Sequence, residues 1–209
     1  MFVKSVMVNR EKVYTVTPDD PIEKGLEILE RYTVDALPVV EGTTYKGIFT
    51  WYHAYRAYFY SGQTKEEFNA STKIKDILVN EDVYLGIDDV YEKALVEVSD
   101  FPIIAVVENS EFLGIVTRFD LMNQLQSAFG MNQKGTRITF TSVESEGRIG
   151  RLGEIIEKFK ESVISLVTFD ETDKVVRRIV LKIRKKDNIA LFVKHLEAAG
   201  FRVLDVSED

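Results

Sequence analysis

An internal repeat within the first 130 residues constrains the fold more than any other feature of this sequence. Four short stretches recur in the same order, with an offset that falls from 71 to 67 residues. Because such matches indicate two copies of one supersecondary unit, a pair of similar modules is expected. The matches are Val8-Asn9 with Val79-Asn80, Glu23-Lys24-Gly25-Leu26 with Glu92-Lys93-Ala94-Leu95, Val39-Val40-Glu41 with Val106-Val107-Glu108, and Gly47-Ile48-Phe49-Thr50 with Gly114-Ile115-Val116-Thr117.

Each copy is expected to fold in the order strand, helix, strand, strand, helix. Asp20 followed by Pro21 and Glu23 is typical of a helix N-terminus, where the aspartate caps free backbone N–H groups. Asp89 predicts the corresponding cap in the second copy. The other predicted elements are the strand 36–40, turn 42–44 and strand 45–49, and then the strand 103–107, turn 109–110 and strand 112–116.

A hydroxyl and a carboxylate follow the last glycine of the second copy, in the stretch from Gly114 to Asp120. Thr117 and Asp120 stand three residues apart at a strand-to-helix junction, a spacing typical of side chains that cap free backbone N–H groups. The same pair has the chemistry needed to bind the diol of a ribose. The two roles are compatible, and the residues alone leave both interpretations open.

Composition excludes several classes of partner and site. The chain has 209 residues, 45% of them hydrophobic, which is enough for packed cores in two or three small domains. Its formal net charge of −7 argues against nucleic acid or a membrane as a partner, since either needs a basic face. The absence of cysteine rules out disulfides and thiolate chemistry. No apolar run is long enough for a membrane helix, so a soluble cytoplasmic protein is expected.

Each copy resembles a CBS domain, the small module first named for cystathionine β-synthase. The resemblance is carried best by Leu37-Pro38-Val39-Val40 and by the stretch from Gly114 to Asp120. It implies an α+β fold in which two CBS-type βαββα modules, at residues 1–62 and 63–130, pack as a pseudo-twofold pair. It also implies two clefts between the copies, of a kind that commonly binds adenine nucleotides, nucleosides or S-adenosylmethionine.

The resemblance further implies a ribose site in each cleft, formed by one copy and closed by the other. In the first cleft the hydroxyl and acid are Thr117 and Asp120. In the second they are Thr50 and His53. His53 replaces the expected carboxylate and Ala105 replaces a proline of the family pattern, so the first cleft is expected to be the competent one. The first cleft would also use Ile115, Val8, Asn9, Val13, Tyr14, Val34, Asp35 and Ala36, and the second Asn80, Val83, Tyr84, Phe101, Pro102 and Ile103.

The candidate ligands are adenosine, AMP and S-adenosylmethionine, and no cofactor is required. Family members that prefer highly charged nucleotides place cations near the phosphates, whereas Asp35 and Ala36 occupy such positions here. The remaining cations nearby are Arg10, Lys12 and Arg118. A ligand of low negative charge is therefore expected in preference to a triphosphate.

The helix expected after Thr50 is unusually aromatic between Trp51 and Tyr60. One interpretation is that nucleotide bases stack on these rings. The favoured alternative is that they pack against the other copy or a second subunit, because large rings most often supply apolar contact area. A metal site is not expected, since His53 and His195 are the only histidines and no cysteine is present.

Residues 136–209 predict a different domain, with the order strand, helix, strand, strand, helix, strand of the ferredoxin-like split unit. Its predicted elements include a turn at 170–174 and a strand at 175–183. The segment resembles an ACT domain, a module that senses amino acids. The resemblance implies an amino-acid site at Ile149, Gly150 and Leu152, although Ile149 replaces the usual proline. The glycine has a plain alternative as a tight-turn residue, and such domains also pair edge to edge into dimers.

No catalytic constellation is visible in the sequence, so an enzyme is not expected. Two sensing modules in this order are also the arrangement of acetoin-utilisation-type CBS–ACT proteins. The leading hypothesis is a homodimeric, non-catalytic regulatory protein that binds an adenosine-type metabolite between the CBS copies and acts on an unknown regulated protein. The alternative is a structural dimerisation or adaptor protein whose ligand clefts are vestigial.

Overall fold

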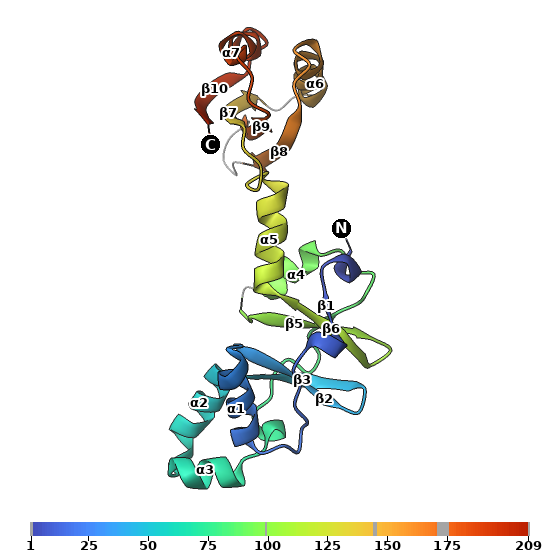
Figure 1. Ribbon diagram of the computed structural model, residues 1–209, viewed down its shortest axis with the longest axis vertical. Coiled ribbons are helices and arrows are strands. Elements are labelled where there is room, and N and C mark those ends of the chain that lie inside the picture. Colours follow the sequence, from blue (N-terminus) through green and yellow to red (C-terminus); the bar gives the residue numbers. More distant parts are fainter. Residues whose placement is uncertain (1, 99, 144–145, 171–175, 209) are drawn as a thin grey trace. The chain divides into compact units, whose positions relative to one another are not determined.

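The structure of the chain is a computed structural model that describes residues 2–98, 100–143, 146–170 and 176–208. The chain is an α+β protein, as the sequence predicts, and its order of elements matches the expected one except for an additional helix (Figure 1). The chain divides into two units, Met1–Met122 and Asn123–Asp209. Helix α5 (Arg118–Ala128) begins in the first unit and ends in the second.

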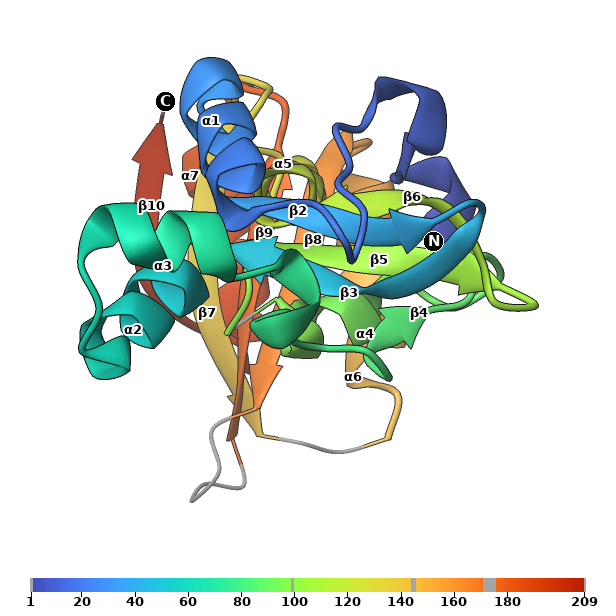
Figure 2. The same ribbon diagram turned by 90° about the horizontal axis from the view of Figure 1, so that it is seen from below.

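The first unit is built around two β-hairpins, one from each copy of the repeat (Figure 2). In one copy β2 (Ala36–Glu41) pairs antiparallel with β3 (Thr44–Thr50). In the other β5 (Ile103–Glu108) pairs antiparallel with β6 (Glu111–Thr117), and β4 (Tyr84–Leu85) runs parallel to β5. The two halves meet in one sheet, because Thr44 of β3 pairs with Glu111 of β6.

The leading segment of each copy crosses the last strand of the other copy. Strand β1 (Val8–Asn9) pairs antiparallel with β6, placing Asn9 opposite Gly114. In the same way Val79, in the leading segment of the second copy, forms a bridge with Ile48 of β3. Both crossings occur at a glycine, since a Cβ on Gly114 would lie 2.1 Å from the Val8 carbonyl oxygen and one on Gly47 2.7 Å from that of Val79. The two copies are therefore interlocked through backbone contacts that leave no room for a side chain.

The hydrophobic cores show the same exchange. Val3, in the 3₁₀ turn η1 (Val3–Ser5), is buried with Leu85 and Val116 of the second copy. Ile74, in the 3₁₀ turn η3 (Ile74–Asp76), is buried with Leu37 of the first copy. A third core of nonpolar residues lies between the two hairpins. Another 3₁₀ turn, η2 (Arg10–Lys12), follows β1.

Two aspartates do not cap helices as the sequence predicts. Helix α1 (Ile22–Tyr32) begins after Pro21 with no side-chain cap, because the Asp20 carboxylate accepts a hydrogen bond from the backbone N–H of Thr17 (2.8 Å). Ahead of helix α4 (Glu92–Glu97), the Asp89 carboxylate accepts from the N–H of Gly86 (2.9 Å). Both aspartates therefore close a turn that precedes the helix. The two copies share this feature, but the predicted capping role is wrong.

Helix α3 (Lys65–Ser71) was absent from the expected order of elements, although its start has a readable signal. Thr64 accepts a hydrogen bond from the N–H of Glu67 (3.3 Å), and the Glu67 carboxylate accepts from the N–H of Thr64 (3.0 Å). A threonine followed three residues later by a glutamate is the pattern of this reciprocal cap. The helix contacts α1 and α2 (Trp51–Ser61) (Figure 1).

The second unit has the split βαββαβ order that its sequence pattern predicts. Its four strands form an antiparallel sheet in the order β10-β7-β9-β8, which is the ferredoxin-like arrangement. The predicted turn at 170–174 falls, apart from Asp170, outside the described residues, as does the first residue of the predicted strand at 175. The elements are β7 (Thr136–Val143), α6 (Arg148–Lys158), β8 (Val163–Asp170), β9 (Val176–Ile183), α7 (Ile189–Ala198) and β10 (Arg202–Glu208).

None of the helices in the described part of the chain combines the length and apolar composition that a membrane span needs.

The substitution Gly114→Ala is expected to destabilise the first unit by about 1–3 kcal/mol, because the added methyl group overlaps the Val8 carbonyl. Urea unfolding followed by the fluorescence of Trp51, the single tryptophan, measures the change. Gly86→Ala is the matched control, since a Cβ there would meet no atom closer than 3.6 Å. Equal stabilities of the two variants would contradict the crossing as described.

Candidate functional site

Two adjoining hollows lie in the first unit, beside the ends of β3 and β6. The first has a volume of about 510 Å³ and the second about 320 Å³. They share Asp35, Pro102 and Arg118, so they are parts of one larger depression. The first is also lined by Thr33, Val34, Ala36, Ile103, Ile115, Thr117, Phe119 and Met122, and the second by Thr50, Trp51, Tyr52, His53, Asp100 and Phe101.

The first hollow brings together residues from both copies of the repeat, as the sequence predicts. Val34, Asp35 and Ala36 lie at the junction between α1 and β2, whereas Ile115 and Thr117 lie at the end of β6. Ile115 and Ala36 also belong to the core between the two hairpins, which fixes this wall. Part of the wall is therefore held by core packing, a property that suits a binding site.

Thr117 and Asp120 cap the N-terminus of α5 reciprocally. The Thr117 hydroxyl donates to the Asp120 carboxylate (2.5 Å) and accepts from the Asp120 N–H (3.1 Å). The same carboxylate oxygen, Oδ2, accepts from the Thr117 N–H (3.3 Å). The other oxygen, Oδ1, accepts no hydrogen bond from a described residue. The capping interpretation is thus correct for both residues, and it leaves one carboxylate oxygen available to a ligand.

Asn9, Val13 and Tyr14 lie outside the lining of the first hollow. Asn9 is opposite Gly114 in the β1–β6 pair, and Val13 packs against the core between the hairpins. The Tyr14 ring stacks on Tyr32, with 3.7 Å between ring centroids. Any part of these three residues in binding stays a prediction.

Thr50 and His53 repeat the cap at the start of α2 and line the second hollow. The Thr50 hydroxyl lies 2.8 Å from Nδ1 of His53 and accepts a hydrogen bond from the His53 N–H (3.2 Å). The imidazole stacks on Phe101, with ring planes 9° apart and centroids at 6.0 Å. Burial lowers the pKa of His53, and the positive charge of Arg56 lowers it further. The imidazole is therefore neutral near pH 7, so the cap beside this hollow has no counterpart to the Asp120 carboxylate.

Phe101 and Pro102 line the second hollow as the sequence predicts, but Asn80, Val83 and Tyr84 do not. Asn80 has a left-handed backbone (φ 60°), and its carbonyl accepts a hydrogen bond from the Tyr45 hydroxyl (2.9 Å). Tyr84 packs edge-on against Tyr45, and Val83 packs against the core of the second copy. All three residues therefore make their contacts elsewhere in the first unit.

Several lining residues were missed by the sequence analysis. Phe119 and Met122 flank Asp120, and Phe119 is 72% exposed beside the first hollow. Their spacing of three places them on one side of α5, so helical periodicity offered a usable signal. Thr33, which ends α1 in a left-handed conformation (φ 53°), offered none, because only the structure shows that backbone.

A smaller hollow of about 170 Å³ lies at the start of α6 in the second unit and is lined by Ile149 and Gly150. Leu152 is fully buried in the core and does not line it. Gly150 is inside the helix, so the alternative role of this glycine in a tight turn is wrong. Gly147, with φ 80°, is the residue that turns the chain into the helix.

Comparisons with known proteins identify the fold of the first unit. Residues 3–60 match the CBS domain family. A CBS domain-containing protein of unknown function from Bacillus anthracis is 26% identical over 60% of this chain and 93% of its own, with a TM-score of 0.55. The chain therefore contains a CBS domain, and α+β proteins of this kind are its structural neighbours.

Two more distant neighbours share the fold and were solved with ligands. CbpB from Listeria monocytogenes, in complex with c-di-AMP, is 22% identical over 58% of this chain and 92% of its own, with a TM-score of 0.52. CBSX2, a CBS-pair protein from Arabidopsis thaliana, was solved in complex with AMP. It is 20% identical over 59% of this chain and 95% of its own, with a TM-score of 0.51.

The substitution Asp120→Ala removes the α5 cap and is expected to lower the free energy of unfolding by about 1 kcal/mol. The backbone N–H and the hydroxyl of Thr117 both lose their acceptor in this variant. Urea unfolding followed by Trp51 fluorescence measures the loss. Asp100→Ala is the control, since Asp100 lies on the wall of the second hollow and makes no hydrogen bond or ion pair with a described residue. A loss in Asp100→Ala as large as that in Asp120→Ala would argue against the cap.

The lowered pKa of His53 predicts a dependence of stability on pH. Because the folded-state pKa lies below the ordinary value of 6.5, the unfolded chain binds this proton more readily. The stability that neutral His53 contributes is present above pH 6.5 and is lost as the pH falls through the folded-state pKa. Urea midpoints measured from about pH 5 to about pH 8 should therefore fall less on the acid side in His53→Gln than in the wild type. His195→Gln is the control, and an unchanged acid limb in His53→Gln would refute the prediction.

Proposed function

We propose that the protein is a non-catalytic regulatory protein that binds an adenosine-containing metabolite in the first hollow. The observation that carries this proposal is a hollow of about 510 Å³ that is lined by Thr117 from one copy and by residues 34–36 from the other. That volume lies within the range of small-molecule sites. Asp120 does not itself line the hollow, but its carboxylate accepts a hydrogen bond from the Thr117 hydroxyl beside it. The AMP and c-di-AMP complexes of CBSX2 and CbpB support an adenine nucleotide as the class of ligand.

The free Oδ1 of Asp120 is the group best suited to a ribose hydroxyl. The capping hydrogen bonds hold the carboxylate in place through Oδ2, so little side-chain freedom would be lost on binding. Ile115, Val34 and Ala36 offer the apolar wall that a flat base needs. A carboxylate that accepts from two hydroxyl groups would distinguish a ribose from a deoxyribose.

The charges around the two hollows favour a ligand with few phosphates. Asp35 and Asp100 line them, against the single cation Arg118. The Arg118 guanidinium donates through Nε to the carbonyl of Val98 (3.1 Å), so it is already held on one side. Adenosine, AMP or S-adenosylmethionine therefore fits better than ATP, whose four negative charges would face two carboxylates.

The second hollow is the weaker candidate. His53 is neutral near pH 7 and engaged with Thr50, so it offers no anionic oxygen to a diol. The Phe101 ring and Pro102 still give it an apolar wall. Occupancy of this hollow is expected only at concentrations well above those that fill the first.

The second unit is proposed to be an ACT-like regulatory domain. Its ferredoxin-like order and the hollow at the start of α6 support that assignment. Backbone N–H groups at a helix start suit the carboxylate of a small amino acid. Arg148, which also lines the hollow, is held by the Ser142 hydroxyl (2.7 Å) and by the carbonyl of Gly200 (2.8 Å).

An adaptor function is the second candidate, and the surface of α2 favours it. Tyr52, Tyr55, Phe59 and Tyr60 are between 56% and 79% exposed on this helix. Exposed aromatic patches of this kind mark protein–protein interfaces more often than free surface. Packing of this face against a second copy would give the homodimer that the sequence led us to expect, whether or not the hollows bind a ligand.

Titration calorimetry tests the binding proposal. AMP is expected to bind more tightly than ATP, and Thr117→Ala combined with Asp120→Ala is expected to weaken AMP at least tenfold, or about 1.4 kcal/mol. Thr50→Ala combined with His53→Ala removes the equivalent cap beside the second hollow and should leave the tightest site nearly unchanged.

Three results would count against the proposal. Tighter binding of ATP than of AMP would refute the charge argument. An equal loss in both double variants would show that the caps matter only for folding. No binding of any adenosine compound to the wild type would favour the adaptor function.

A further inference from the structure

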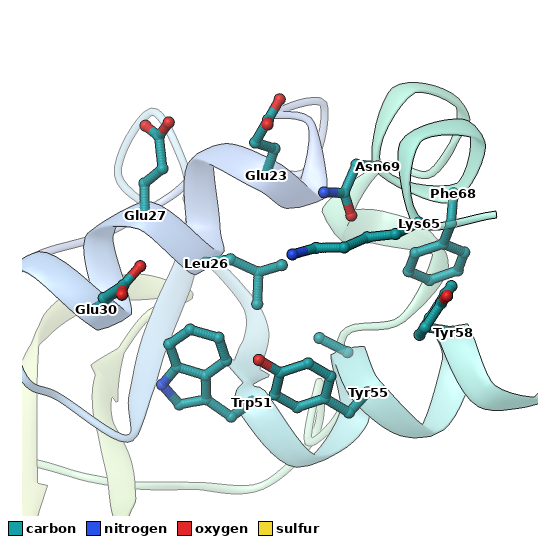
Figure 3. Close-up of a pocket in the computed structure, with 11 residues that line it drawn as sticks. Glu23, Leu26, Glu27, Glu30, Trp51, Tyr55, Tyr58, Lys65, Phe68 and Asn69 are labelled. Carbon is teal, nitrogen blue, oxygen red and sulfur yellow. The ribbon is translucent and has the colours of Figure 1, made fainter.

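A third hollow, distinct from both nucleotide candidates, lies among helices α1, α2 and α3 (Figure 3). Its volume is about 480 Å³, again within the range of small-molecule sites. Trp51, at the start of α2, is the one residue that it shares with the second hollow, and it shares none with the first. Its lining is Glu23, Leu26, Glu27, Glu30, Trp51, Ala54, Tyr55, Tyr58, Lys65, Phe68 and Asn69.

One side of this hollow is aromatic. Trp51 and Tyr55 stack on each other, with ring centroids 5.5 Å apart and planes 12° apart. Tyr58 packs against the buried ring of Phe68 at 5.5 Å. Figure 3 shows the Trp51 and Tyr55 rings side by side on α2, facing the opening toward α1. The electron-rich faces of such rings attract cations, and tryptophan does so most strongly.

The other side is acidic. Glu23, Glu27 and Glu30 follow at intervals of four and three residues, so they lie on one face of α1. None of the three makes an ion pair with a described residue, whereas the neighbouring Lys24 is paired with Asp20 at 2.8 Å. In Figure 3 Glu30 is the glutamate nearest Trp51, whereas the side chains of Glu23 and Glu27 point away from the aromatic rings. Glu30 and the aromatic faces thus border the same space, and Glu23 and Glu27 add negative charge at its rim, so all of them favour a cation there.

The chain itself already places a cation there. Lys65 extends from α3 across the hollow, and its ammonium group lies near Leu26 between α1 and α2 (Figure 3). Lys65 is the only cationic residue of the lining, against three carboxylates. No described acidic group lies within ion-pair distance of its ammonium group. The hollow therefore accommodates an alkyl chain ending in an ammonium group, and it keeps an excess of two negative charges when Lys65 is counted.

We propose that this hollow binds a small alkylammonium compound, a linear diamine or polyamine, in place of the Lys65 side chain. One ammonium group would lie between Glu30 and the face of Trp51, where a carboxylate and an aromatic ring both stabilise it. The methylene chain would cover Leu26 and Ala54, as the methylenes of Lys65 cover part of the hollow in the free protein. This proposal does not depend on nucleotide binding in the first hollow, since the two hollows have no lining residue in common.

Titration calorimetry of the full chain with spermidine tests the proposal, with Trp51 fluorescence as a second readout. Binding is expected in the wild type. The triple variant Glu23→Gln, Glu27→Gln, Glu30→Gln should bind spermidine at least tenfold more weakly, because it loses all three carboxylates of the hollow. A control triple variant removes the same charge elsewhere, through exposed glutamates on other helices, and should change the affinity less than about twofold. The control substitutions are Glu92→Gln, Glu97→Gln and Glu154→Gln.

Removal of the competing cation gives a result of opposite sign. Lys65→Ala is expected to tighten spermidine by about threefold or more, since the ligand no longer displaces an ammonium group of the chain. Lys134→Ala, which removes an exposed lysine of the other unit, should tighten it by clearly less.

Several results would overturn the proposal. The first is equal weakening by the two triple variants, which would show that spermidine follows net charge alone. The second is equal tightening by the two lysine variants. The third is the absence of binding to both the wild type and Lys65→Ala at about 10 mM spermidine in low salt. The neutral probe 1,5-pentanediol should not bind, and binding as tight as that of spermidine would also overturn it.

Discussion

The close approach of backbone to backbone at Gly47 and Gly114 is the constraint on which the first unit depends. Each glycine lies against a carbonyl oxygen in the leading segment of the other copy, at a distance that excludes a Cβ. The same crossings place Val3 in the core of the second copy and Ile74 in the core of the first. Neither copy can therefore complete its core without a segment of the other, and the pair folds as one unit.

This interlocking also explains where the candidate sites lie. The last strand of each copy is held from one side by the crossing segment and ends at a hydroxyl that caps the next helix. The wall opposite Thr117 then comes from residues 34–36 of the other copy, because β2 belongs to the neighbouring hairpin. A ligand between them would contact both copies at once, and its binding would stabilise their association. The two caps differ in one respect: Asp120 presents a free carboxylate oxygen, whereas His53 presents a neutral ring.

Much of the fold could be predicted from the sequence because its signals are local. The repeat, the hairpin turns expected at 42–44 and 109–110, and the βαββαβ order of the second unit depend on patterns within a few residues. The caps at Thr117 and Asp120 were among the alternatives for the same reason. By contrast, the caps expected at Asp20 and Asp89 were wrong, because each carboxylate turns back to a backbone N–H three residues earlier. An aspartate at such a position can accept a hydrogen bond from the helix that follows or from the turn that precedes it, and the sequence alone does not determine which one forms.

The candidate site was predicted only in part, because its walls are set by tertiary packing. Residues beside the glycines and caps, such as Ala36 and Ile115, were found because the repeat aligns them. Tyr14 and Tyr84 were placed in the clefts by the same alignment, yet each ring packs against another tyrosine. The hollow among α1, α2 and α3 could not be predicted from the sequence, because it forms only when α3 packs against both other helices. Helices α1 and α2 together span more than thirty residues of the chain, so no local pattern brings them together.

Backbone amide NMR during a titration with AMP tests the central claim most directly, because it reports the location of binding as well as its strength. The largest saturable shifts are predicted at residues 34–36 and 115–120, on both sides of the first hollow. The residues of the second unit, 123–209, should show smaller shifts. Saturable shifts confined to the second unit, or none in either unit, would contradict the assignment of the adenosine site to Thr117 and Asp120.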